Sequence, residues 1–460
     1  MTRAPGLIGS SCQRVIIGLG KTGMSCVRYL AEQGLPFKVV DTRSQPPGID
    51  VLLAEFPEVE VHVGGFNEPW LMAADELIVS PGVALAEPII ARAIEQGAEA
   101  IGDIELFCRT VNNNDKPVPV IAITGSNGKS TVTTLLGEMA EESGLTVGVG
   151  GNIGTPALEL LNNPETDLYI LELSSFQLET VRTLHATAAT VLNLSADHMD
   201  RYPTLADYHK AKQVVYMGCS TAVFNRDDAL TTPLLPVTAG AVSFSTSVAD
   251  LNQYGLMTDD QGVWLCKGFK KLLNTRTMKM RGRHNQQNAL AALALGEVVG
   301  LNFDAMVRVL QRFTGLPHRC QWLAEHNGIS WFNDSKATNV GASVAAINGL
   351  GSDLSGKIVL IAGGDGKGAD FSDLKLPVQH YISQLILLGQ DASIIQQAVE
   401  DAAPVHRVAD LNEAVMLADS LAVTGDAVLL APACASFDMF SSFEKRGEVF
   451  AALVKERISC

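Results

Sequence analysis

The sequence predicts an α/β protein with three consecutive domains, each built on a sheet of mostly parallel strands. Short apolar runs, which are typical of buried parallel strands, alternate with helical segments along the chain. Three of these runs enter glycine-rich loops, at residues 18–23, 124–131 and 363–368. A chain of 460 residues also exceeds the size at which one hydrophobic core normally divides into several.

Two polar, breaker-rich stretches, residues 111–117 and 313–319, mark the expected domain boundaries. We therefore predict domains over residues 1–115, 116–315 and 316–460. The first and last are expected to be Rossmann-like, and the central one to have the mostly parallel sheet of a P-loop ATPase. Residues 236–280 alternate short apolar runs with Gly, Asn and Asp, which predicts a small antiparallel sheet beside the central one.

The composition is that of a globular protein in a reducing compartment. Hydrophobic residues make up 47% of the chain, which favours a folded core over disorder. No apolar stretch approaches the roughly 20 residues that a membrane helix needs, and residues 1–12 lack the apolar segment of a signal peptide. The eight cysteines are scattered without a C-x-x-C pair, which favours free thiols over disulfides or a zinc site. These features predict a cytoplasmic protein.

The net charge of −16, from 34 Lys and Arg against 50 Asp and Glu, limits the possible partners. An acidic chain argues against binding to nucleic acid or to anionic membranes. It also repels small anions, so a phosphate or carboxylate site requires a local concentration of Lys and Arg. The motifs below supply such local concentrations.

The central glycine loop has the features of a phosphate cradle. Residues 118–123 predict a buried strand, and residues 130–143 predict a helix directly after the loop. Gly125 and Gly128 would let backbone N–H groups turn inward, and the start of the helix adds a positive potential. A glycine turn without a ligand is the alternative interpretation.

The residues after this loop favour a bound nucleotide. Lys129 would reach the β- and γ-phosphates, and the Ser130 hydroxyl would bind Mg²⁺. The usual phosphate-loop pattern has glycine where Ile123 stands, so this loop is a compressed form. The expected ATP-binding segment is Gly125, Ser126, Asn127, Gly128, Lys129, Ser130 and Thr131.

The N-terminal glycine loop follows the dinucleotide fingerprint. Residues 18–23 read G-x-G-x-x-G after an apolar strand, and Asp41 ends the next strand about 20 residues later. Arg43 suits a ligand that carries additional negative charge. Another strand ends at residues 80–82, which could contact the same ligand. A Rossmann-like domain with an empty pocket is the alternative.

Polar residues also follow the central strands. Glu172 lies near the end of an apolar strand, where a Mg²⁺ ligand is expected beside a phosphate loop; a surface acid is the alternative. Asn152 lies in a glycine-rich segment that suggests close approach to a ligand. His198, among acidic residues at a strand end, is either a metal ligand or a solvated loop residue. Lys210 and Lys212 lie in a predicted helix, where lysines are usually solvated.

The last third of the chain carries further polar clusters. Asn285 and Asn288 share one face of a predicted helix, either as N-caps or as amides that reach a base. Three polar residues alternate along one later stretch: Asp334, Lys336 and Thr338. In the third glycine loop, Lys367 favours a small anionic group over a dinucleotide, although an ordinary loop charge is the alternative.

Together and in order, these motifs resemble the Mur ligases, the ATP-dependent amide-forming family of peptidoglycan synthesis. The resemblance covers almost the whole chain, and the compressed phosphate loop is the family's own form. In the first half it rests on G-L-G-K-T-G (18–23), D-T-R (41–43), G-D-I-E-L-F (102–107), T-G-S-N-G-K-S-T (124–131), G-G-N-I-G (150–154), L-E-L-S-S-F-Q-L-E (171–179) and D-H-M-D-R-Y (197–202). In the second half it rests on G-L-P-H-R (315–319), N-D-S-K-A-T-N (333–339), G-D-G-K (364–367) and A-C-A-S-F-D (433–438).

The resemblance implies a role for individual residues. The implied catalytic residues are Lys129, Glu172, His198 and Lys212, the last carbamylated by CO₂, with Lys210 as the fallback. The implied ligands of two Mg²⁺ ions are Ser130, Glu172, His198 and carbamylated Lys212. Besides the phosphate loop, ATP would contact Asn285, Asn288, Arg319, Asp334 and Lys336. The UDP-linked substrate would contact Gly20, Lys21, Thr22, Asp41, Thr42, Arg43, Ser80, Gly82, Asn152, Ser174, Gln177 and His198. D-Glutamate would contact Thr338, Lys367, Ser436, Phe437 and Phe443.

The implied reaction joins D-glutamate to UDP-N-acetylmuramoyl-L-alanine, uses ATP and passes through an acyl phosphate. The expected partners are these three molecules, without nucleic acid or membrane. The resemblance implies a monomer in cytoplasmic precursor synthesis for the cell wall, and so for cell shape and division. The alternatives are a sister ligase or folylpolyglutamate-type synthetase that adds another amino acid, a nucleotide-dependent switch, and an NAD-linked oxidoreductase. The last leaves the phosphate loop and Glu172 unexplained.

Overall fold

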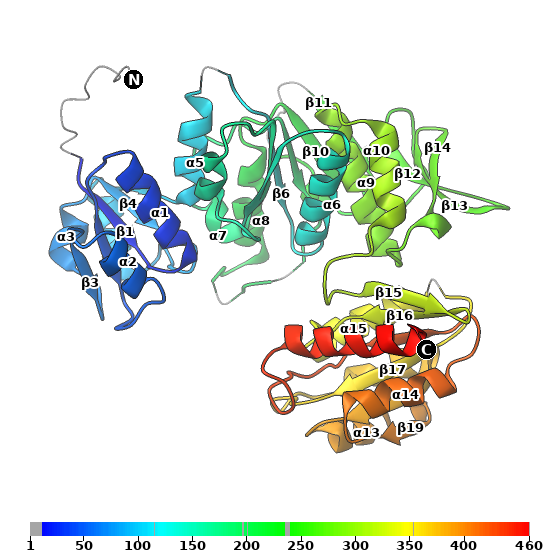
Figure 1. Ribbon diagram of the computed structural model, residues 1–460. Helices are drawn as coiled ribbons and strands as arrows, with labels where there is room; N and C mark the ends of the chain where they lie inside the picture. Colours follow the sequence, from blue (N-terminus) through cyan, green and yellow to red (C-terminus); the bar gives the residue numbers. More distant parts are fainter. Residues whose placement is uncertain are drawn as a thin grey trace. The chain divides into compact units, whose positions relative to one another are not determined.

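The computed structural model describes residues 12–114, 116–195, 197–199, 201–234, 240–352 and 354–459 (Figure 1). The chain forms two compact units. The first comprises the chain up to Gly255 with Lys267–Lys270 and Leu290–Met306, and the second comprises Leu256–Cys266, Lys271–Ala289 and Val307–Cys460. Parallel sheets with flanking helices occur in both units, so the predicted α/β class is confirmed. The two predicted domain boundaries remain predictions.

The N-terminal glycine loop follows the central strand of the first sheet. The strands of this sheet are β1 (Arg14–Ile17), β2 (Lys38–Asp41), β3 (Val61–Val63), β4 (Glu76–Val79) and β5 (Glu99–Ile101). Their order is β3-β2-β1-β4-β5, and all neighbours are parallel. The helices between them are α1 (Lys21–Glu32), α2 (Ile49–Glu55), α3 (Glu68–Met72) and α4 (Pro88–Glu95). A Cβ atom on Gly23 would lie 1.9 Å from the Gly18 carbonyl oxygen, so only glycine lets α1 pack this closely on the loop.

A second parallel sheet carries the phosphate loop. Its strands are β6 (Val120–Thr124), β7 (Val147–Gly151), β8 (Leu168–Glu172), β9 (Ala188–Val191), β10 (Thr221–Asn225) and β11 (Gly240–Phe244), in the order β11-β10-β9-β6-β8-β7. The accompanying helices are α6 (Lys129–Glu142), η1 (Ala157–Asn162), α7 (Ser175–Leu178), α8 (Leu205–Gln213), η2 (Val214–Tyr216), η3 (Ala229–Thr231), α9 (Arg283–Val298) and α10 (Phe303–Arg312). β6 lies between β8 and β9, so the loop leaves the interior of the sheet.

The predicted antiparallel sheet is only partly correct. β11 pairs with β10 in parallel along its whole length, and Tyr254 continues this parallel pairing opposite Phe244. The strands that follow are β12 (Tyr254–Asp259), β13 (Gly262–Lys267) and β14 (Lys270–Asn274), with η4 (Thr275–Thr277) after them. Two-residue connections join these three neighbouring strands, and such short connections require antiparallel pairing. The prediction was wrong for residues 240–244, because a local alternation of apolar and polar residues does not determine whether a strand pairs in parallel or antiparallel.

The C-terminal sheet has one antiparallel edge. Its strands are β15 (Gln321–His326), β16 (Ile329–Asn333), β17 (Ile358–Gly363), β18 (Ile382–Leu388), β19 (Val405–Arg407) and β20 (Ala427–Leu430), in the order β15-β16-β20-β17-β18-β19. Only β15 and β16 form an antiparallel pair; the other neighbours are parallel. The helices are α11 (Val340–Gly351), η5 (Ser372–Leu374), α12 (Lys375–Tyr381), α13 (Ala392–Val399), η6 (Glu400–Ala402), α14 (Leu411–Leu421) and α15 (Phe443–Ser459).

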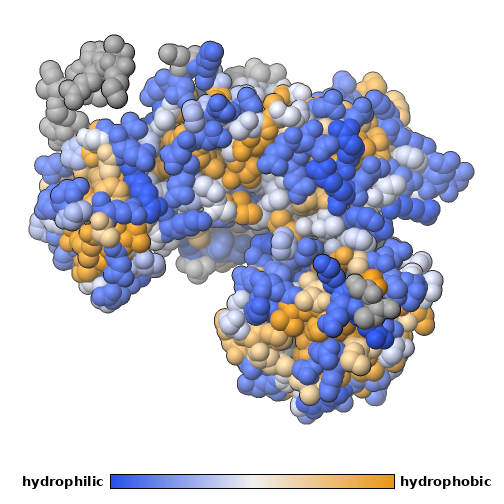
Figure 2. Space-filling model, viewed as in Figure 1, coloured by the Kyte–Doolittle hydropathy of each residue, from blue (hydrophilic) through white to orange (hydrophobic). Residues whose placement is uncertain are grey.

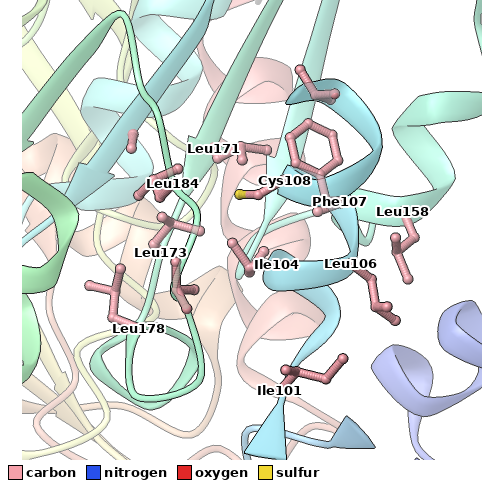
Figure 3. Packing of buried hydrophobic residues seen from close by; sticks show 14 of the residues in the cluster. Ile101, Ile104, Leu106, Phe107, Cys108, Leu158, Leu171, Leu173, Leu178 and Leu184 are labelled. Atoms are coloured by element: carbon pink, nitrogen blue, oxygen red, sulfur yellow. The ribbon is translucent and has the colours of Figure 1, made fainter. Parts of the chain in front are cut away.

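Helix α5 (Asp103–Asn112) connects the first two sheets and is deeply buried on one side. Ile104, Phe107 and Cys108 belong to one hydrophobic cluster with residues from β8 and α7, including Leu171 and Leu178 (Figure 3). The helix packs against η1, α7 and α1. Part of the apolar face of this connecting helix therefore belongs to the core under the phosphate-loop sheet.

The surface of the molecule is chemically mixed. Hydrophilic and hydrophobic residues are interspersed over the face seen in Figure 2. Within the described ranges, every helix is too short or too polar to cross a membrane.

Candidate functional site

The phosphate loop occupies residues 125–128, between β6 and α6. Gly128 has a φ of +83°, a left-handed value that favours glycine, directly before the first helical residue. The first three residues of α6 are Lys129, Ser130 and Thr131. The N–H groups in the first turn of an α-helix have no intrahelical acceptor, so this end of α6 is suited to bind anions.

Hydrogen bonds join the phosphate loop to the segment after β9. Asn193 accepts from the Ser126 N–H through its carbonyl oxygen at 2.9 Å and from the Asn127 N–H through Oδ1 at 2.8 Å. The Ser126 hydroxyl accepts from the Ser195 N–H at 3.0 Å. The N–H groups of Ser126 and Asn127 are therefore engaged within the protein. We therefore expect the N–H groups at the start of α6 to donate the hydrogen bonds to a bound phosphate.

Two lysines converge on one carbonyl oxygen of the loop. Lys129 Nζ donates to the carbonyl oxygens of Gly125 at 2.8 Å and Ser126 at 3.0 Å. Lys212 Nζ, from α8, donates to the same Gly125 oxygen at 2.9 Å and to Thr124 Oγ1 at 3.3 Å. The fold thus brings together two cationic side chains that are far apart in the sequence.

The surroundings of Lys212 disfavour its charged form. The side chain is fully buried, and this burial, together with nearby Lys129, lowers its pKa from 10.5 to about 7. The nearby carboxylates of Asp197 and Glu172 act in the opposite direction. Lys210, the alternative position, is exposed. Burial therefore distinguishes two lysines that the sequence pattern does not.

Glu172 ends β8 with its side chain buried. Its Oε1 accepts a hydrogen bond from Asn152 Nδ2 at 2.7 Å, and its backbone oxygen accepts from the Asn152 N–H at 2.8 Å. Oε2 is buried and has no hydrogen-bond partner among the described residues. A buried carboxylate oxygen without a partner is costly, so this site fits a bound cation.

His198 lies on the loop after β9 with half of its side chain exposed. Its φ of +55° is left-handed, which is uncommon outside glycine. Its ring lies 4.8 Å from that of Phe176 and 3.5 Å, through Nε2, from Asp197 Oδ2. Among the described residues, there is no group of three or more His, Cys, Asp or Glu side chains arranged to hold a metal ion.

In the N-terminal sheet, Asp41 organises the glycine loop. Its carboxylate accepts from the Leu19 N–H at 2.7 Å and receives two bonds from the Arg43 guanidinium, at 2.6 and 2.9 Å. Burial raises the pKa of Asp41, but the hydrogen bonds from Arg43 and Leu19 outweigh this and hold it below its usual value. Asp41 is thus occupied within the protein, and half of the Arg43 side chain remains exposed beside the loop.

Other predicted nucleotide contacts surround the same loop. Ser80 Oγ donates to the Gly18 carbonyl oxygen at 3.0 Å. Lys21 Nζ reaches the Gly154 carbonyl oxygen at 2.5 Å, which links this loop to the segment after β7. Space is open above Gly20 and Gly82, where a Cβ atom would meet nothing within 4 Å. The remaining two predicted contacts are Thr22, on α1, and Thr42, which is exposed.

Ser174 and Gln177 form the capping box of α7. Gln177 Nε2 also donates to Asp103 Oδ2 on α5 at 3.3 Å. Burial raises the pKa of Asp103 to about 6, although the Gln177 hydrogen bond lowers it. These contacts show how both residues hold local structure beside Glu172; their contact with substrate remains a prediction.

In the second unit, Asn285 and Asn288 lie in the first turns of α9, which begins at Arg283. The N-cap interpretation is therefore wrong, because both residues lie inside the helix. Asn285 Nδ2 donates to the Arg281 carbonyl oxygen at 2.8 Å, and Asn288 Nδ2 donates to Asn285 Oδ1 at 3.3 Å. Their arrangement leaves the alternative of amides that reach a base.

The loop after β16 carries the next predicted group. Asp334 Oδ1 accepts from the Cys320 N–H at 3.1 Å, and burial raises the pKa of Asp334 to about 6 against the effects of this bond and of Arg319. Lys336 Nζ lies 5.5 Å from the centre of the Phe443 ring. The Thr338 N–H bonds the Lys336 carbonyl oxygen at 2.8 Å, so these residues form one tight turn.

The last predicted residues gather at the ends of β17 and β20. Lys367 Nζ lies 5.6 Å from the ring centre of Phe437, which is 68% exposed. Ser436 is buried directly before it, and Phe443 begins α15. Asp365 and Ala435 exchange two backbone hydrogen bonds, which join the two loops. The ammonium group of Lys367 is the part of this arrangement that suits a small organic anion.

Arg446 is a buried residue that the sequence analysis did not identify. Its guanidinium donates to Ser335 Oγ and to the carbonyl oxygens of Ser335, Cys434 and Ala435, at 2.9–3.2 Å. It therefore joins the loop after β16 to the loop after β20. No local signal marks it, because one arginine near the start of a helix normally faces solvent.

Fold and site together define a nucleotide-binding α/β protein whose phosphate loop is flanked by a buried carboxylate and a buried lysine. Comparison with known families agrees with this class and identifies the family within it. Residues 12–102 match the Mur ligase MurD-like N-terminal domain, residues 123–296 the Mur ligase middle domain, and residues 318–434 the Mur ligase glutamate ligase domain. The chain belongs to the Mur ligase family, as its motifs indicated.

Curated relatives match along nearly their whole length. A UDP-N-acetylmuramoylalanine–D-glutamate ligase of Pseudomonas aeruginosa is 55% identical over 98% of this chain and 99% of its own. The enzyme of that name from Nitrosococcus oceani is 52% identical over 97% of each chain.

Solved structures support the fold. UDP-N-acetylmuramate-alanine ligase MurC from Thermotoga maritima has a TM-score of 0.53 at 17% identity and covers 97% of this chain and 99% of its own. A pseudomurein peptide ligase type C from Methanothermus fervidus has a TM-score of 0.52 at 18% identity, over 97% of this chain and 100% of its own.

Proposed function

We propose that this protein joins D-glutamate to UDP-N-acetylmuramoyl-L-alanine and uses ATP to form the amide bond. The observation that carries the proposal is 55% identity, over 98% of this chain, to a ligase named for these substrates. We place the reaction in the cytoplasm, where both nucleotides occur. We also propose that the protein acts as a monomer, as the resemblance to the Mur ligases implies.

The first step brings two anions together. The alanyl carboxylate of the nucleotide substrate attacks the γ-phosphate of ATP, which gives an acyl phosphate and ADP. In this proposal Lys129 exchanges the carbonyl oxygens of Gly125 and Ser126 for phosphate oxygens. The N–H groups at the start of α6 stabilise the same charge.

Two Mg²⁺ ions would be held by Ser130, Glu172, His198 and a carbamate on Lys212. The unpartnered Oε2 of Glu172 supports this assignment, because oxygen donors of this kind suit a hard divalent cation. Bound Mg²⁺ would neutralise the negative charge of the phosphates.

The carbamate follows from the environment of Lys212. With a pKa of about 7, the amine is substantially neutral at neutral pH. Its nitrogen can then form a bond to the carbon of CO₂, and a proton leaves to solvent. A buried neutral amine becomes an anion, which together with Glu172 would attract a divalent cation.

The second step uses residues from the loops of the C-terminal sheet and the start of α15. The proposed D-glutamate contacts are Thr338, Lys367, Ser436, Phe437 and Phe443. Lys367 would bind a carboxylate, and the amine of D-glutamate would then attack the acyl carbon as phosphate leaves. Asn152 and His198 would orient the acyl end, so that positioning contributes to the rate.

Phosphate release tests the proposed function. The purified protein is supplied with ATP, Mg²⁺ and UDP-N-acetylmuramoyl-L-alanine, and D-Glu, L-Glu, L-Ala, L-Lys and meso-diaminopimelate are added one at a time. Release with D-Glu alone, with the corresponding mass gain on the nucleotide, is expected. Phosphate release with another amino acid would indicate that the enzyme is a sister ligase. ATP turnover that needs no amino acid would favour a nucleotide-dependent switch.

A further inference from the structure

The loop that carries His198 is attached to the N-terminal nucleotide loop by one arginine. Arg201 donates through Nη1 to the Pro81 carbonyl oxygen at 3.1 Å and through Nη2 to the Val83 carbonyl oxygen at 3.3 Å. The N–H of Arg201 in turn bonds the His198 carbonyl oxygen at 2.9 Å. A short chain of hydrogen bonds therefore joins His198 to the turn after β4.

Ser80 and Gly82 are predicted contacts of the UDP-linked substrate, and both lie in the turn after β4. The Val83 N–H bonds the Ser80 carbonyl oxygen at 2.9 Å and closes this turn. Ser80 Oγ bonds Gly18 in the glycine loop. A ligand that orders this turn would also order the two carbonyl groups that Arg201 contacts.

Glu179 holds Arg201 in this geometry. Its Oε2 accepts from Arg201 Nη2 at 2.6 Å, and its Oε1 accepts from the Tyr202 hydroxyl at 2.6 Å. The Arg201 guanidinium lies 4.3 Å from the centre of the Phe176 ring. The side chains of Arg201 and Glu179 are only 14% and 18% exposed, so the contact is better shielded than a surface ion pair.

The helix that carries Phe176 also contacts the reaction centre. Ser174 caps α7 two residues after Glu172, and Gln177 joins α7 to Asp103 on α5. Segment 174–179, which begins two residues after Glu172, therefore contacts the His198 loop and helix α5. Neither Glu179 nor Arg201 has a role in the proposed chemistry itself.

We propose that Arg201, held by Glu179, is a positioning residue that couples the occupied nucleotide pocket to the placement of His198. This inference rests on the proposed function. Binding of the uridine diphosphate, far from the reacting carboxylate, would accelerate the chemical step through this connection, because energy from a remote substrate part is used to orient the reacting end.

Two substrates separate this role from simple structural support. We would measure kcat and KM for phosphate release with UDP-N-acetylmuramoyl-L-alanine and with N-acetylmuramoyl-L-alanine, which lacks the UDP. The variants are Arg201→Lys, which keeps the charge but loses the forked geometry, and Glu179→Gln, which removes the ion pair. Arg182→Gln is the matched control, because within the part of the chain that the structure describes the exposed Arg182 guanidinium bonds only the nearby carbonyl oxygens of Glu179 and Val181.

The wild type should have a higher kcat with the full substrate than with the truncated one. Arg201→Lys and Glu179→Gln should lower kcat for the full substrate by about 10-fold and leave the truncated substrate within about twofold. Arg182→Gln should change neither. An equal loss on both substrates, or no loss, would overturn the proposal, as would a wild type that gains nothing from the UDP. Absence of D-Glu-dependent turnover in the wild type would instead refute the proposed function.

Discussion

Replacing Lys212 by methionine should stabilise the protein more at low pH than at high pH. The substitution keeps an apolar stem and removes an amine whose pKa falls from 10.5 to about 7 on folding. Unfolding of the wild type therefore takes up a proton between pH 7 and pH 10.5. Because the unfolded state binds more protons, wild-type stability rises with pH across this window and is lowest below it.

The structure gives the size of this effect. Each tenfold change in an ionisation constant is worth about 1.4 kcal/mol, so the deficit relative to a neutral side chain reaches about 5 kcal/mol below pH 7. At about pH 9 it falls to about 2 kcal/mol, because the unfolded lysine is then closer to its own pKa. The hydrogen bonds from Lys212 to Gly125 and Thr124 are lost in the variant, which lowers the gain by a similar amount at both pH values. The stabilisation should therefore shrink by about 3 kcal/mol between pH 6 and pH 9.

Urea unfolding in CO₂-free buffer at the two pH values measures this difference. Removal of CO₂ keeps the wild-type amine free of carbamate. The matched control is Lys210→Met, an exposed lysine on the same helix, which should show little change at either pH. A gain for Lys212→Met that is the same at both pH values, or that Lys210→Met reproduces, would refute the argument from burial.

Three further predictions concern residues that contact the phosphate loop or the N-terminal glycine loop. Lys129→Ala should lower D-Glu-dependent phosphate release by at least about 100-fold, and near-normal turnover would disprove the phosphate-loop role. Lys212→Ala should lose activity that added formate or acetate partly restores, and a variant without either loss or rescue would count against a carbamate. Gly23→Ala should destabilise the protein by about 3 kcal/mol in urea unfolding, because its Cβ would collide with the Gly18 carbonyl oxygen. Gly20→Ala is the stability control, since open space surrounds that position; an equal loss in both variants would contradict the packing explanation.

Features that depend on neighbouring residues were predictable from sequence. The phosphate loop is recognisable because strand, glycine turn and helix start follow one another directly, and the structure has β6, residues 125–128 and α6 in that order. The same holds for the N-terminal fingerprint around Gly23. The direction of strand pairing was less predictable, so β11 was assigned to an antiparallel sheet although it pairs with β10 in parallel.

The sequence pattern also does not predict how deeply a side chain is buried. Lys210 and Lys212 stand two residues apart on α8, but only the structure reveals that Lys212 is buried against the phosphate loop. The partner of Asp41 is another example, because the fingerprint predicts a ligand contact where Arg43 and Leu19 already occupy the carboxylate. Arg201 was part of a recognised motif, but its partners come from a strand end more than a hundred residues earlier.

Helix α5 has a consequence for building chimaeric ligases. Its carboxylates bind the segment between β8 and β9: Asp103 contacts Gln177, and Glu105 accepts from the N–H groups of Arg182 and Thr183 at 2.7 and 2.9 Å. A chimaera joined near residue 115 would replace α5 together with the N-terminal domain. The rest of the chain would then lose these hydrogen bonds to Asp103 and Glu105. A junction between β5 and α5 would retain them. Gly102 should stay with α5, since a Cβ atom there would lie 2.5 Å from Thr180 Oγ1.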